Sequence, residues 1–221
     1  MTTNLIEHNK GLLTELKQRP SVKDLLDGIK IQERLDKVLV ILLDCSGSMS
    51  SQMEGQRKLD VSWQVFKDEL MPNMQGWTYG VVRFEDDAYW EVLPSQDIQA
   101  LLSQGTPRLG GQTSMGKGLI IAWDWVEHNA RQARFIMLTD GLPTDMTQLG
   151  ILELARKNSS IPIDTVGIGT GTHSYDPVFL VALSSITGGL FVEAGTVKLL
   201  ADTIKKLSPA ERPLLGPVKE A

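Results

Sequence analysis

The residues from Val38 to Leu43 are all apolar, a pattern typical of a strand that is covered on both faces of a parallel sheet. Leu59, Trp63, Phe66 and Leu70 follow at spacings of four, three and four residues. This spacing predicts a helix with one buried stripe, because residues three or four apart lie on the same helix face. The chain thus passes from a buried strand into an amphipathic helix.

The rest of the chain continues to alternate between the two patterns. Two strands, at 78–84 and 88–93, are separated only by the acidic turn 85–87, and this short gap predicts an antiparallel hairpin. Further strands are expected at residues 135–139, 161–168 and 190–192, and helices at about residues 114–128, 147–158, 176–186 and 197–207. Alternation of this kind predicts an α/β fold, in which helices cover both faces of a parallel sheet.

The two ends of the chain differ from this alternating region. Residues 1–36 carry leucines and isoleucines in a loosely helical pattern that Pro20 interrupts, which predicts an N-terminal helical extension. Residues 208–221 contain three prolines and are expected to form a flexible C-terminal tail. The α/β domain is therefore assigned to residues 37–207.

Charge and cysteine content narrow the class of protein. The net charge of −5 argues against sequence-independent nucleic-acid binding, which needs a basic face. The longest apolar run is far shorter than the roughly 20 residues that span a bilayer, and residues 1–20 lack the apolar stretch of a secretory signal. Cys45 is the only cysteine, so no intrachain disulfide can form. We expect a cytoplasmic protein that binds neither nucleic acid nor membrane.

Candidate ligand groups follow the first buried strand. Asp44, Ser46 and Ser48 present a carboxylate and two hydroxyls on alternate residues, and Gly47 allows the tight bend between them. In an open parallel sheet, ligand-binding groups collect beyond the carboxyl ends of the strands, where the strand order reverses. An isolated Asp-x-Ser-x-Ser sequence is more often an ordinary turn whose serines cap backbone amides, so the assignment depends on further groups.

Two other segments supply such groups. Thr113 follows the flexible pair Gly110-Gly111 just before a predicted helix, and Asp140 ends the predicted strand 135–139. If that strand pairs in parallel with the first one, Asp44 and Asp140 emerge at the same edge on chains about 5 Å apart. All the converging groups are hard oxygen ligands, which favour Mg²⁺, with Mn²⁺ and Ca²⁺ as alternatives.

The order Asp-x-Ser-x-Ser, then Thr after a Gly-Gly turn, then Asp-Gly at a strand end resembles the metal-ion-dependent adhesion site of von Willebrand factor A domains and integrin inserted domains. The resemblance covers roughly residues 38–207, and the fragment 139–145 resembles small stand-alone bacterial members. It implies a Rossmann-like, doubly wound, mostly parallel six-stranded sheet with one antiparallel edge strand and helices on both faces. The residues that it implies as ligands of one divalent cation are Asp44, Ser46, Ser48, Thr113 and Asp140.

The resemblance also implies a function. Family members bind partners by accepting a partner's carboxylate as the last ligand of the cation. We therefore expect a binding module rather than an enzyme, whose protein partner supplies an Asp or Glu side chain. The resemblance to some prokaryotic members implies that this partner is a chaperone-like ATPase assembly.

A phosphate-binding loop is the alternative. Residues Gly111 to Lys117 match G-x-x-x-x-G-K, which would make the protein a P-loop-like NTPase. However, Gly118 stands where a Ser or Thr must bind magnesium, and the preceding residues 105–109 do not form a strand pattern. Nucleotide binding is therefore the less favoured hypothesis.

Overall fold

The protein is described by a computed structural model that covers residues 34–73, 76–95, 97–169 and 175–208. Almost all of the predicted N-terminal extension and of the predicted C-terminal tail lies outside these residues. Within them, no helix is long and apolar enough to cross a bilayer. The domain begins with a strand at Leu35, which pairs with Ala130.

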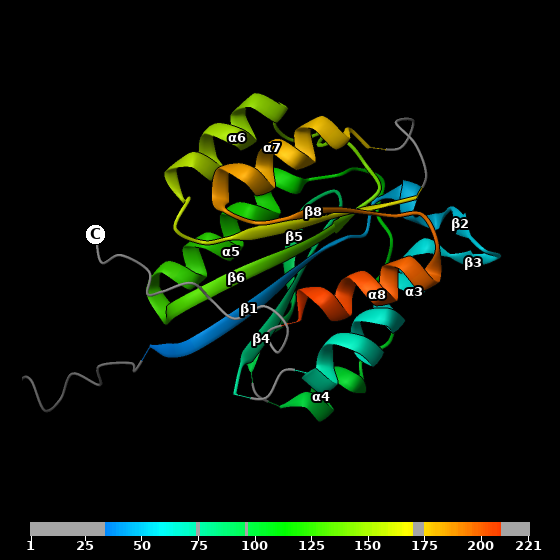
Figure 1. The fold of residues 1–221 in the computed structure, drawn as a ribbon, viewed down its shortest axis with the longest axis horizontal. Helices are drawn as coiled ribbons and strands as arrows, with labels where there is room; N and C mark the ends of the chain where they lie inside the picture. The colour runs from blue at the N-terminus through cyan, green and yellow to red at the C-terminus, as the bar shows by residue number, and fades with distance from the viewer. Residues whose placement is uncertain (1–33, 74–75, 96, 170–174, 209–221) are drawn as a thin grey trace, which may run out of the picture. The chain divides into compact units, whose positions relative to one another are not determined.

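A six-stranded sheet forms the centre of the domain, in the order β5-β4-β1-β6-β7-β8 (Figure 1). Its strands are β1 (Leu35–Asp44), β4 (Thr78–Phe84), β5 (Ala88–Ser95), β6 (Ala130–Thr139), β7 (Ile163–Ile168) and β8 (Phe191–Ala194). All neighbouring strands are parallel except β4 and β5. The predicted mostly parallel sheet with one antiparallel edge strand is confirmed, and β5 is that strand.

The two central strands fix where the candidate site lies. β1 and β6 pair in parallel, with Leu42 opposite Met137 and Leu43 opposite Leu138. The residues that follow these pairs therefore leave the sheet at the same edge, because parallel strands run in the same direction. The parallel pairing on which the expected convergence of Asp44 and Asp140 depends is confirmed.

Helices cover both faces of the sheet (Figure 1). One face carries α5 (Met115–Asn129), α6 (Gln148–Lys157) and α7 (Pro177–Thr187), and the other carries α3 (Lys58–Val65), α4 (Ile98–Leu102) and α8 (Val197–Leu207). β1 contributes to both resulting cores: Leu39 and Ile41 pack on the α3 and α8 side, and Val40 and Leu42 on the α5 to α7 side. This alternation arises because successive strand side chains point to opposite faces.

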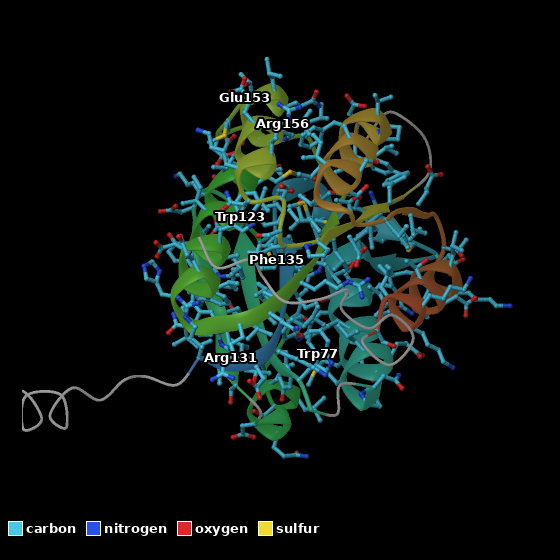
Figure 2. All side chains as sticks on the ribbon, turned by 60° about the vertical axis from the view of Figure 1, so that its left-hand side comes forward. Trp77, Trp123, Arg131, Phe135, Glu153 and Arg156 are labelled. Atoms are coloured by element: carbon cyan, nitrogen blue, oxygen red, sulfur yellow. The ribbon has the colours of Figure 1, made fainter. Side chains whose placement is uncertain are left out.

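Aromatic and aliphatic side chains hold the helices against the sheet. Figure 2 shows Trp123 of α5 beside Phe135 of β6, and their ring centroids are 6.2 Å apart. On the other face, the predicted stripe on α3 and the helical turns that follow it is confirmed, since its four members are all buried: Leu59, Trp63, Phe66 and Leu70.

A small hairpin between β1 and α3 was not predicted. It consists of β2 (Gln52–Met53) and β3 (Gln56–Arg57), and lies near the end of the sheet where β1 finishes (Figure 1). Its turn residues Glu54 and Gly55 both have positive φ, at 51° and 82°, as two-residue turns that match the twist of a hairpin require. Two-residue strands leave too little periodicity for a sequence pattern to detect.

Candidate metal centre

Three chain segments meet beyond the ends of β1 and β6, and they carry the predicted ligands. Ser46 and Ser48 lie in the loop after β1, and their hydroxyl oxygens are 3.0 Å apart. The Ser48 hydroxyl donates a hydrogen bond of 2.6 Å to Oδ1 of Asp140, which follows β6. Residues 92 positions apart in the sequence are thus in direct contact, as the parallel pairing of β1 and β6 predicts.

Asp44 is fully buried at the centre of this group. Its Oδ1 accepts a 2.8 Å hydrogen bond from the backbone N–H of Ser46, and its Oδ2 accepts one of 2.5 Å from the hydroxyl of Thr139. Burial raises the pKa of Asp44 to about 6, although the hydrogen bonds from Ser46 and Thr139 act in the opposite direction. A carboxylate taken out of water in this way is stabilised by a nearby cation.

Asp140 is also fully buried, and it already has a positive partner. Lys58, the first residue of α3, places its Nζ 2.7 Å from Asp140 Oδ2, while Ser48 occupies the other oxygen of the carboxylate. Lys58 belongs to no sequence motif, and only the packing of α3 against the ends of the strands brings its ammonium to Asp140.

Thr113 faces the same space as Asp44. A Cβ placed on Gly141 would lie 3.1 Å from Thr113 Oγ1 and 3.5 Å from Asp44 Oδ2, so both oxygens border that position. The backbone of Thr113 is held by Thr144, whose Oγ1 accepts from the Thr113 N–H at 3.0 Å and whose own N–H donates to the Thr113 carbonyl at 3.0 Å. The structure therefore gathers all five predicted ligands at one edge of the sheet.

The loop that carries Thr113 is also anchored on its other side. Oδ1 of Asp86, in the turn between β4 and β5, accepts hydrogen bonds from the backbone N–H groups of Gly111 at 3.2 Å and Gln112 at 2.9 Å. The carbonyl of Cys45 accepts from the Gly110 N–H at 2.8 Å. Cys45 itself is fully buried behind the site, and burial raises the pKa of its thiol well above the ordinary range.

The contacts at the start of α5 give no support to the phosphate-loop alternative. The backbone N–H groups of Gly116 and Lys117 both donate to the carboxylate of Asp145, at 3.2 and 2.8 Å. A phosphate would need such amides to be available to it. Lys117 is half exposed on the helix and pairs with Asp87 at 3.2 Å, and residues 105–109 are irregular rather than a strand.

The donor set fits a hard cation. Within residues 34–73, 76–95, 97–169 and 175–208, no three His, Cys, Asp or Glu side chains gather as metal ligands. A cation at this edge therefore depends on hydroxyls as well as on Asp44 and Asp140. A set made only of carboxylate and hydroxyl oxygens suits Mg²⁺, which keeps waters and takes one or two carboxylates.

Fold and site together define an α/β domain with an oxygen-lined loop cluster at the carboxyl edge of its sheet. The family model of the von Willebrand factor type A domain matches residues 39–142, a range that contains all five predicted ligands. This part of the chain is therefore a von Willebrand factor type A domain. No curated protein sequence matches it.

Solved structures share the fold at low sequence identity. A von Willebrand factor type A protein from Catenulispora acidiphila aligns with a TM-score of 0.63 and 21% identity, over 80% of this chain and 43% of that one. The VWA2 paralog of ArnB from Sulfolobus acidocaldarius gives 0.61 and 17%, over 80% and 46%. An aerotolerance-related membrane protein from Bacteroides fragilis gives 0.60 and 16%, over 76% and 96%. At these identities the comparisons establish the fold alone.

Proposed function

We propose that this von Willebrand factor type A domain is a divalent-cation-dependent protein-binding module. A cation, Mg²⁺ in the first instance, binds at the metal-ion-dependent adhesion site and accepts an Asp or Glu side chain of a partner protein. The observation that carries the proposal is the convergence of five oxygen-bearing side chains from three separate loops. The site offers oxygen ligands and buried charge, which are the elements of cation-bridged recognition.

The physical reason for a carboxylate partner lies in the neutral ligands. Three of the five donors are hydroxyls, which contribute to the coordination of a cation without cancelling its charge. A cation bound in this way attracts an anionic ligand more strongly than a neutral one. A partner carboxylate is therefore the favoured last ligand, and the amount of charge that the protein itself supplies decides how strongly it is favoured.

Calorimetric titration of Mg²⁺ tests the cation site. We expect binding to the wild-type protein and none to Asp44→Asn. This substitution removes the negative charge of the carboxylate at the end of β1 and keeps the size of the side chain. Asp124→Asn is the matched control, since Asp124 is an exposed residue of α5, far along the helix from the site loop. Circular dichroism shows whether Asp44→Asn stays folded. Equal Mg²⁺ affinity in wild type and Asp44→Asn would overturn the assignment.

Partner binding is tested by affinity capture from native lysate, run in parallel with Mg²⁺ and with a chelator. The expected partner is a cytoplasmic protein, with a chaperone-like ATPase assembly as the first candidate. The specific captured protein should disappear both with chelator and with Asp44→Asn as bait. A partner that survives both treatments would show that binding does not use the cation.

A further inference from the structure

Lys58 occupies an unusual position for a lysine. Its side chain is 8% exposed, although lysine is almost never this deeply buried unless it is paired. It is also the first residue of α3, where a positive charge is opposed by the helix dipole. The neighbouring Arg57 shows the ordinary arrangement, since it forms an exposed ion pair with Asp60, one helical turn away.

The ammonium of Lys58 is enclosed between the ends of two strands. It contacts the Asp140 carboxylate beyond β6 at 2.7 Å. A Cβ placed on Gly169, at the end of β7, would lie 3.2 Å from Nζ, and Gly169 has a φ of +117°, which side chains rarely adopt. The backbone N–H of Lys58 donates to the carbonyl of Ser51 at 2.9 Å, which connects the start of α3 to the loop after β1.

Stability alone does not account for this ion pair. Taking two charges out of water costs free energy that their attraction often fails to offset, so a buried pair is weak evidence for a stabilising role. What the pair changes is the charge of the site. Asp44 and Asp140 together carry two negative charges, and the Lys58 ammonium reduces the net charge to one.

We propose that Lys58 is a positioning residue that weakens cation binding and strengthens binding of the partner's carboxylate. By neutralising Asp140, it leaves a site with a bound divalent cation one unit positive, whereas without Lys58 the two carboxylates would cancel the cation's charge. The excess positive charge is then available to an anionic ligand. This inference rests on the proposed function, because it needs a cation at the adhesion site.

The substitution Lys58→Met tests the inference, because methionine has a similar length and no charge. A unit charge a few ångströms from a divalent cation changes the binding constant by at least about tenfold even in a well-screened site. We expect Lys58→Met to bind Mg²⁺ at least about tenfold more tightly by calorimetry. Lys205→Met, which removes an exposed charge in the last turn of α8, should leave the affinity unchanged.

The second half of the inference uses fluoroacetate as the carboxylate probe. Bound Mn²⁺ broadens the ¹⁹F signal of any fluoroacetate that binds beside it, so the dissociation constant follows from a titration of the Mn²⁺-loaded protein. We expect the affinity for fluoroacetate to fall at least about tenfold in Lys58→Met. Lys58→Arg keeps the charge and should restore both affinities towards the wild-type values.

Thermal denaturation separates this role from a merely structural one. Without cation, Lys58→Met leaves the Asp140 carboxylate buried and unpaired, so its Tm should fall, and saturating Mg²⁺ should raise the Tm more than in wild type. A Tm that falls equally with and without Mg²⁺, or an unchanged Mg²⁺ affinity in Lys58→Met, would overturn the proposed role of Lys58. Neither result would overturn the proposed cation site itself. Absence of cation binding in the wild-type protein itself would overturn the proposed function together with this inference.

Discussion

Thr139 offers a sharp test of how the buried carboxylate of Asp44 is held. The side chain of Thr139 is fully buried at the end of β6, and its hydroxyl makes three contacts. It donates to Asp44 Oδ2 at 2.5 Å and accepts from the backbone N–H of Gly141 at 3.1 Å, and it lies 3.4 Å from the Gly141 carbonyl, a longer alternative acceptor for the same proton. The substitution Thr139→Val keeps the size and branching of the side chain and removes the contacts of the hydroxyl.

The expected loss of stability follows from the two shorter contacts, with the Asp44 carboxylate and with the Gly141 N–H. A hydrogen bond to a charged group contributes about 1.5–3 kcal/mol, and a buried N–H left without an acceptor costs about 1–3 kcal/mol. The Asp44 carboxylate keeps its hydrogen bond from the Ser46 N–H, which reduces the cost of losing the bond from Thr139. We therefore expect Thr139→Val to lower the free energy of unfolding by about 3 kcal/mol in total. For a domain of this size, that lowers the Tm by about 6–12 °C.

Urea denaturation in the presence of a chelator measures this loss without a contribution from bound cation. Thr139→Ser is the control, because it keeps the hydroxyl and loses one methyl group, which costs about 1 kcal/mol. A change of less than about 1 kcal/mol in Thr139→Val would contradict the reasoning, because losses of hydrogen bonds to buried charged groups exceed that value. So would equal losses in the Val and Ser variants.

Two further predictions concern the loops around the site. Thr113→Ala should weaken partner binding more than it weakens binding of free Mg²⁺. The reason is that Thr113 follows the Gly110-Gly111 turn and is expected to ligate the cation fully only as the partner binds. Equal losses of affinity in the two titrations would show that Thr113 is a static ligand. The purified protein should neither bind nor hydrolyse ATP, and Lys117→Ala should leave the Tm and partner binding nearly unchanged, because the Lys117 ammonium forms an exposed ion pair with Asp87 and such pairs contribute little to stability. A micromolar ATP affinity that is lost in Lys117→Ala would restore the nucleotide-binding hypothesis.

Local sequence patterns determined most of the fold. The unbroken apolar run 38–43 identified the central strand, since a strand buried on both faces cannot place polar residues on either side. Helix periodicity located α5 and the stripe on α3, and the acidic turn 85–87 between two short strands identified the antiparallel hairpin at the sheet edge. These features were predictable because each depends on burial within one short segment. The β2–β3 hairpin and α4 were not predicted, because segments of two and five residues are too short to show a period.

The order of residue types along the chain also identified the candidate ligands, and parallel pairing of β1 with β6 explains why Asp44 and Asp140 meet. Tertiary structure alone decided the groups that surround them. Lys58, Thr139 and Asp86 reach the site through packing between elements distant in sequence, and each contact depends on a side-chain direction that no local pattern encodes. The charge of the site was therefore set by the fold, because the ammonium that neutralises Asp140 comes from the start of a helix 82 residues earlier in the chain.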